Sequence, residues 1–91
     1  MECFKASIPI LKVLCDETRL SILSMLSHAD MNGCEINRAF ACSQPTISYH
    51  MKLLVDARLV RARKEGCAVI YSVDSEIWPR VRALLDVLCA S

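Results

Sequence analysis

The chain has 91 residues, of which 54% are hydrophobic, a mean hydropathy of +0.33 and a formal net charge of +1 at pH 7. This length predicts one domain over residues 1–91, and no apolar run reaches the roughly 18 residues that a membrane helix needs. Pro9 and Lys12 interrupt the apolar N-terminal part, which is unlike a secretory signal, so we expect a cytoplasmic protein. The apolar content exceeds what one small core can bury, which favours self-association.

The first half of the chain predicts short helices. The first is apolar and runs from Ile8 or Pro9 to Leu14, and Asp16 is expected to cap a second over Glu17 to Ser27. The inward residues of this second helix are predicted to be Leu20, Leu23, Ile22 and Leu26. A loop over residues 28–33 then leads to a third helix, Cys34 to Phe40, with its core residues expected at Ile36, Ala39 and Phe40.

The stretch from Cys42 to Leu54 is the most informative part of the chain, and it reads CSQPTISYHMKLL. Ser43 can accept a hydrogen bond from an early backbone N–H, and Pro45 suits a first helical turn. Ile47, Met51 and Leu54 follow the i, i+4, i+7 spacing of a buried face. The predicted outward side chains are uncharged hydrogen-bonding groups with one cation, a set suited to base edges in a major groove: Gln44, Thr46, Ser48, Tyr49 and Lys52. An ordinary amphipathic surface helix is the alternative.

A short helix, a three-residue connection and this longer helix, running to about Ala57, predict a helix-turn-helix. The sequences LVRARK and AVIYSV follow, separated by Glu65, Gly66 and Cys67, and predict a hairpin. Arg61, Arg63 and Lys64 lie on or near its tip, so it could grip a phosphate backbone or a minor groove. A solvated charged hairpin is the alternative. Residues 34–73 carry six basic and three acidic residues, a net charge of +3 that is hidden in the total.

The last segment predicts a long helix with one apolar side: Ile77, Val81, Leu84, Leu85 and Leu88. We expect it to pair with the first helix and with a symmetry mate. The predicted fold is therefore mainly α with a small β-hairpin, a winged helix-turn-helix that forms a homodimer through its first and last helices. A two-fold dimer would set two recognition helices about one DNA turn apart.

Six cysteines are present, without a CxxC spacing: Cys3, Cys15, Cys34, Cys42, Cys67 and Cys89. We expect reduced thiols, so a metal or redox site would need distant segments or two subunits. Cys34 lies at a predicted helix N-terminus, where the helix dipole favours negative charge. This position suits a cysteine that binds a metal as a thiolate. Each of the others has a structural alternative, because a buried free cysteine behaves as a small hydrophobe. Cys67 is expected to be exposed at the hairpin turn and is either incidental or a redox liability.

Three stretches resemble the ArsR/SmtB family of winged-helix metalloregulators: LCDETRLSIL at 14–23, SQPTISYHMKLL at 43–54 and EGCAVIYSV at 65–73. The resemblance implies a dimeric repressor that releases double-stranded operator DNA when a thiophilic metal binds. Of the arsenic-type CxCxxC-like cluster only Cys34 is matched, because Asn32 and Asn37 occupy the other two positions. The resemblance makes Cys3, reaching across the dimer, and Cys15 further candidate ligands.

The zinc and nickel type of site is largely excluded, because the last helix has no histidine. Sulfur ligands without imidazole favour As(III) or Sb(III), or Cd(II), Pb(II) or Cu(I). No metal is expected to be required for DNA binding itself.

The runner-up is a redox or persulfide sensor of the same fold, using Cys15 and Cys89. An enzyme with a Cys–His pair is disfavoured, because so short a chain offers no substrate pocket. A DNA-independent interaction module is disfavoured by the polar helix and the basic hairpin.

Overall fold

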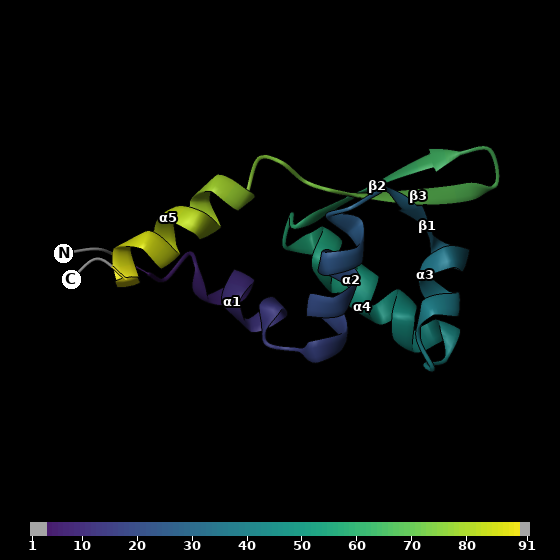
Figure 1. Ribbon diagram of the computed structural model, residues 1–91, viewed down its shortest axis with the longest axis horizontal. Coiled ribbons are helices and arrows are strands. Elements are labelled where there is room, and N and C mark those ends of the chain that lie inside the picture. Colours follow the sequence, from purple (N-terminus) through teal and green to yellow (C-terminus); the bar gives the residue numbers. More distant parts are fainter. Residues whose placement is uncertain (1–3, 90–91) are drawn as a thin grey trace.

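The computed structural model describes residues 4–89, which form an elongated molecule of 47 × 24 × 21 Å (Figure 1). In this range the helices and strands follow in the order α1 Ile8–Leu14, α2 Glu17–Leu26, β1 Met31–Asn32, α3 Gly33–Ala39, α4 Gln44–Asp56, β2 Val60–Glu65, β3 Ala68–Val73 and α5 Trp78–Cys89. A body made of α2, α3, α4 and the sheet carries an arm made of α1 and α5. Across residues 4–89 every helix is too short or too polar to cross a bilayer.

Helix α4 begins and ends as the local sequence dictates. The Ser43 hydroxyl accepts a hydrogen bond from the Thr46 N–H at 3.4 Å, and Pro45 lies in the first turn, which confirms the predicted cap. At the other end Arg58 adopts a positive φ of 61°, and the Leu59 N–H donates to the Leu54 carbonyl at 3.0 Å. This pairing is a Schellman motif with an arginine at the position that glycine usually takes. The motif turns the chain sharply from α4 into β2.

The three strands form one antiparallel sheet in the order β1-β3-β2. Glu65 pairs with Ala68, so the hairpin closes through Gly66 and Cys67. Gly66 has a φ of +62°, as the first central residue of a type II′ turn requires. The predicted hairpin is thus confirmed, whereas β1 was expected to be loop. Two residues that pair only with Tyr71 and Ile70 carry too little pattern to mark a strand in the sequence.

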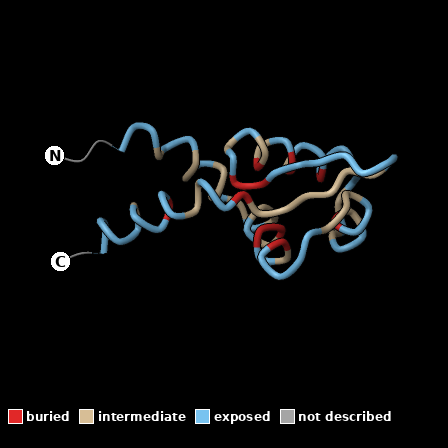
Figure 2. Tube along the Cα trace, turned by 90° about the horizontal axis from the view of Figure 1, so that it is seen from above, coloured by how far each residue is buried: buried red, intermediate tan, exposed pale blue. Residues whose placement is uncertain are grey.

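The core lies where α2, α3 and α4 meet the sheet (Figure 2), and it consists of Ile22, Leu23, Leu26, Ile36, Ile47, Met51, Leu54, Leu59, Val60 and Val81. The three predicted residues of α4 are all buried. The prediction for Leu20 was wrong, because its side chain is 51% exposed. At about 100° per residue, Leu20 lies roughly 110° from the mean direction of Ile22, Leu23 and Leu26. Ala39, also predicted to face inward, is exposed.

Helix α5 is anchored to the body only at its beginning. The Leu59 carbonyl accepts hydrogen bonds from the Asp74 N–H at 3.1 Å and from the Trp78 Nε1–H at 3.2 Å. Val81 is the single buried residue of the helix. Further along the arm, Leu85 and Leu88 are 50% and 61% exposed. The predicted apolar stripe is therefore uncovered over its outer half in one chain.

Leu20 and Leu23 allow a matched test of the α2 packing. Leu23→Ala should lower the free energy of unfolding by about 2–5 kcal/mol, because it opens a cavity in the core. Leu20→Ala, at an exposed position of the same helix, should change it by no more than about 0.5 kcal/mol. Urea denaturation followed by circular dichroism measures both. Equal losses in the two variants would contradict the observed orientation of α2.

Candidate nucleic-acid interface

The outward face of α4 is polar and exposed, as predicted. The exposed set comprises Ser43, Gln44, Thr46, Ser48, Tyr49 and Lys52. The hydroxyl groups of Ser43 and Thr46 lie 2.8 Å apart, so each already has a hydrogen-bond partner at the helix start. Tyr49 is 59% exposed, an unusual position for a large aromatic side chain. Side chains of this kind on one helix can read base edges without carrying a large net charge.

His50 lies on the opposite side of α4 and is withdrawn from this face, with 12% of its side chain exposed. Its Nδ1 lies 3.1 Å from an Arg19 guanidinium nitrogen, and the Arg19 Nε–H donates to the Val13 carbonyl at 2.6 Å. Arginine can only donate, so the Arg19 guanidinium donates this hydrogen bond and Nδ1 accepts it. His50 thus connects α4 to the junction between α1 and α2 and lies away from the exposed polar face of α4.

The same junction carries the cap of α2. The Asp16 carboxylate accepts a hydrogen bond from the Arg19 N–H at 3.0 Å. This backbone hydrogen bond, helped by the charge of Arg19, lowers the pKa of Asp16 against the opposing effect of burial. The predicted cap is therefore confirmed as a charged one. The Asp16 cap stabilises α2, and the buried face of α2 packs against α4.

A groove of about 710 Å³ lies between α3, α4 and β3, and we call it the α3–β3 groove. Gln44 and Ser48 of α4 line it, as do Val69 and Tyr71 of β3. Arg38 of α3 also lines the groove and is exposed, a cation that the sequence reasoning left out of the interface. Its position in the last turn of α3, five residues before the cap of α4, was the available signal. The groove therefore joins part of the polar face to one cation of the neighbouring helix.

The three predicted cations of the hairpin do not share one face. Successive side chains of a strand alternate between faces. Lys64 pairs with Val69 and lies on the groove side, whereas Arg61 and Arg63 lie on the other side. No carboxylate within residues 4–89 forms an ion pair with Lys64. Lys64 is thus the hairpin cation most available to a phosphate beside the groove.

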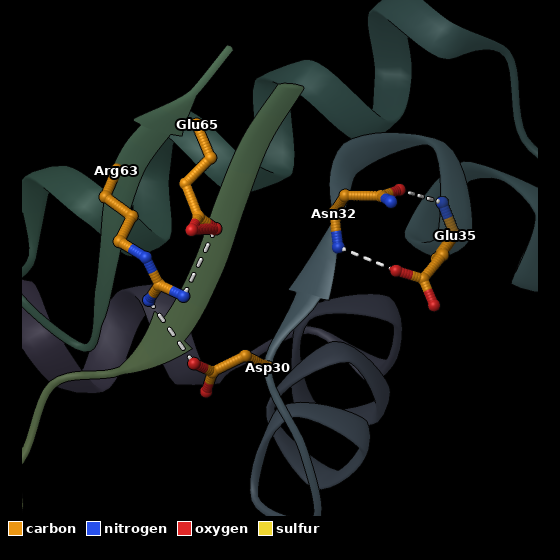
Figure 3. Close-up of polar contacts among 5 residues, drawn as sticks. All are labelled: Asp30, Asn32, Glu35, Arg63 and Glu65. Carbon is orange, nitrogen blue, oxygen red and sulfur yellow. Dashed lines mark hydrogen bonds and ion pairs between the residues drawn. The ribbon is translucent and has the colours of Figure 1, made fainter. Parts of the chain in front are cut away.

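Arg61 and Arg63 are each engaged by two carboxylates. Arg61 lies 3.3 Å from Asp74 and 3.1 Å from Glu76. Arg63 lies 3.3 Å from Asp30 and 3.5 Å from Glu65 (Figure 3). A phosphate would have to compete with these acids for either guanidinium. The exposed pairs of Arg63 are weak, so a phosphate can compete for this guanidinium, but the competition reduces the gain in binding free energy. Asp74 is buried, so Arg61 is held by an acid that is less open to solvent.

Asp74 is the acid that connects β3 to the start of α5. Its Oδ1 accepts a hydrogen bond from the Glu76 N–H at 2.9 Å, and Oδ2 faces Arg61. The hydrogen bond from Glu76, followed by the contact with Arg61, lowers the pKa of Asp74 although its burial acts in the opposite direction. The carboxylate is thus held in its charged form at the base of the hairpin.

The candidate metal ligands lie apart within one chain. Cys34 occupies the first turn of α3, where Asn32 and Glu35 form a reciprocal capping box (Figure 3). Cys15 is exposed at the C-cap of α1, and α2 and α4 lie between α1 and α3 (Figure 1). Cys3 lies outside the described residues. Among residues 4–89, no three His, Cys, Asp or Glu side chains come together as a metal site.

The thiols of the redox alternative also lie apart. Cys89 is the last residue of α5, at the outer end of the arm (Figure 1). Cys15 follows α1 at the opposite end of the arm, where the chain enters α2. Cys15 and Cys89 are both exposed and free. A single chain therefore does not bring them together for a disulfide.

Comparisons with known proteins agree with this geometry. Residues 16–62 match the bacterial regulatory proteins of the arsR family. An arsenical resistance operon repressor of Staphylococcus xylosus is 41% identical over 97% of this chain and 85% of its own length. A possible transcriptional regulator for arsenical resistance has a similar structure, with a TM-score of 0.81 at 28% identity, over 89% of this chain and 84% of that one. A homodimeric winged helix-turn-helix DNA-binding domain of Mycobacterium bovis has a TM-score of 0.77 at 28% identity, covering 93% and 79%.

Asp74 predicts a pH dependence of stability. Its pKa in the folded chain is below the ordinary value of 3.8, so its stabilisation is complete above that value and is lost as the pH falls through the folded pKa. Asp74→Asn should therefore lower the urea midpoint at neutral pH, and the difference from the parent chain should shrink towards about pH 2. Asp56→Asn, at an exposed position of α4, is the matched control. A difference that stays constant with pH would contradict the assignment.

Proposed function

The chain belongs to the arsR family of bacterial regulatory proteins, and on that premise we propose that it releases operator DNA when its cysteine thiolates bind a thiophilic metal or metalloid. Proteins of this family are DNA-binding transcriptional regulators rather than enzymes, and this chain is a transcriptional repressor of that kind. The ligand class that we propose is As(III) or Sb(III), in a cytoplasm that keeps the thiols reduced. The proposed unit is one domain spanning residues 1–91.

The exposed face of α4 supports the DNA-binding part of the proposal. Gln44, Ser48 and Tyr49 offer donors and acceptors for base edges, and Lys52 offers a charge for a phosphate. Arg38 lines the α3–β3 groove, and Lys64 pairs with Val69, which also lines it. The residues that we propose to contact DNA are Ser43, Gln44, Thr46, Ser48, Tyr49, Lys52, Arg61, Arg63 and Lys64, joined by Arg38. We expect Arg61 and Arg63 to contribute less than Lys64, because acids already engage them.

We further propose that two chains pair through the arm. Leu85 and Leu88 of α5 are uncovered, and Phe4 before α1 and Ile8 at its start are 38% and 44% exposed. Exposed apolar surface gathered in one region is typical of an interaction site. The related domain from Mycobacterium bovis is described as homodimeric. Pairing of the arms would bury this surface and present α4 twice to one duplex.

The observation that carries the inducer proposal is the position of Cys34. This thiol lines the α3–β3 groove together with Gln44 and Ser48, which belong to the proposed base-reading face. A metal held by Cys34 would therefore lie beside the DNA-contacting residues. Cys15 and Cys3 remain proposed ligands. A partner chain would have to supply Cys15, because α1 and α3 lie apart in one chain. The relative from Staphylococcus xylosus, an arsenical resistance operon repressor, supports an arsenic ligand.

The DNA contacts can be tested by salt dependence. Lys52→Ala and Lys64→Ala should each weaken duplex binding and reduce the slope of log K against log salt concentration by about 1, because each removes one phosphate contact. Arg82→Ala, at an exposed position on α5, should leave the slope unchanged. Fluorescence anisotropy with a labelled duplex at several chloride concentrations measures these slopes. An equal loss in the Arg82 variant would refute the assignment of this face.

The inducer site can be tested at Cys34. In Cys34→Ser the affinity for operator DNA should be that of the parent chain, because the hydroxyl keeps the exposed polar surface, whereas release by arsenite should be lost. Cys89→Ser, at another exposed cysteine, should release DNA as the parent does. Anisotropy titrations of the reduced protein–DNA complex with arsenite give both readings. Normal release from the Cys34→Ser complex would exclude this thiol as a ligand.

A further inference from the structure

Two thiols line the α3–β3 groove from opposite sides. Cys34 reaches it from the first turn of α3, and Cys67 reaches it from the turn between β2 and β3. Both residues are exposed and free, so both are open to a ligand from solution. No local sequence pattern associates them, because 33 positions separate them along the chain. The sheet brings the two segments together.

The register of the sheet explains why both residues border the same groove. Strand β1 ends at Asn32, opposite Ile70, so Cys34 follows two positions later while Cys67 precedes Ile70 by three on the antiparallel strand. Both therefore lie beyond the same end of the β1–β3 pairing. A Cβ on Gly33 would lie 3.7 Å from the ring of Tyr71, so the start of α3 lies directly against β3. Figure 1 shows α3 and the hairpin turn at the same end of the molecule.

We propose that Cys34 and Cys67 of one chain form a two-thiol site for a trivalent arsenical. The inference rests on the proposed function and adds the second ligand, which α3 alone cannot supply. Arsenous acid, As(OH)₃, would form two As–S bonds while two As–O bonds break. The two thiol protons leave with the two hydroxyl groups as two molecules of water. Arsenic stays in the +3 state, so the step needs no oxidant or reductant, and one hydroxyl group remains on arsenic.

One polar atom of a residue that lines the groove lacks a hydrogen-bond partner among residues 4–89. Asn37 of α3 lines the groove, and its side-chain Oδ1 is buried without a hydrogen-bond donor among residues 4–89. Buried acceptors without a donor are rare in folded proteins. A hydroxyl group on arsenic between Cys34 and Cys67 would supply a donor to this part of the groove. The site thus combines two soft sulfur ligands with an acceptor that has no other partner.

A bridge between these thiols would act directly on the DNA-binding surface. It would tie the hairpin turn to α3 across the groove that Gln44 and Ser48 also line. The same bridge would hold Lys64, three residues before Cys67, in one position relative to α4. DNA release would then follow from closing the groove between the hairpin and α4, without a signal from the arm.

Phenylarsine oxide tests the site, because its arsenic accepts two thiolates and keeps its phenyl group. The reduced full chain, with tris(2-carboxyethyl)phosphine as the reductant, is incubated with one equivalent, alkylated with iodoacetamide and mapped by mass spectrometry. Cys34 and Cys67 should be protected together, with one phenylarsenic group per chain. Cys67→Ser and Cys34→Ser should each weaken binding by about a hundredfold or more, because the chelate is lost. Cys42→Ser, outside the groove lining, should bind as the parent does.

The outcomes separate this inference from the proposed function. If Cys67 is alkylated while Cys34 is protected, or if Cys67→Ser binds as tightly as the parent, the two-thiol site is refuted. Loss of DNA binding on arsenical addition in the Cys67→Ser variant would then leave the proposed function intact with other ligands. Joint protection of Cys34 and Cys67 without any change in DNA affinity would uphold the site and refute the proposed function.

Discussion

The seating of α4 on the core is the constraint on which the other features depend. Ile47, Met51 and Leu54 are buried at helical spacing, and this burial fixes the rotation of the helix about its axis. This rotation directs the side chains on the opposite side of the helix into solvent, among them Gln44, Ser48 and Tyr49. His50 adds a directional contact, because its Nδ1 accepts from Arg19 at the junction of α1 and α2. The polar face is thus a consequence of apolar packing on the opposite side.

In the hairpin, strand pairing and ion pairs place the three basic side chains in different surroundings. The sequence places Arg61, Arg63 and Lys64 close together, but strand alternation and nearby acids divide them. Arg61 and Asp74 fasten the base of the hairpin to the beginning of α5, and Arg63 joins β2 to the segment before β1. These pairs hold the hairpin against the body, while Lys64 remains beside the groove. The ion pairs of Arg61 and Arg63 and the proposed DNA contact of Lys64 therefore fall on neighbouring residues of one strand.

Much of this architecture could be predicted from the sequence. The cap at Ser43, the proline at position 45 and the spacing of Ile47, Met51 and Leu54 are local signals, and they were sufficient for α4. Local signals failed for β1, which exists only through its pairing with β3, and for Leu20, whose direction depends on how α2 rotates against its neighbours. The capping box of Asn32 and Glu35 also has a local signal, because the two residues stand three positions apart at the start of α3. Neither the pairing of the hairpin arginines nor the shared groove of Cys34 and Cys67 has a local signal, because both depend on sheet register.

The most direct test of the account is selection of bound duplexes from a random DNA pool, followed by sequencing. If two chains joined through their arms present α4 to successive major grooves, the selected sites will be inverted repeats whose half-site centres lie about 10–10.5 base pairs, or a multiple of this, apart. Recovery of single half-sites, of direct repeats, or of no enriched sequence at all would contradict a symmetric pair of recognition helices.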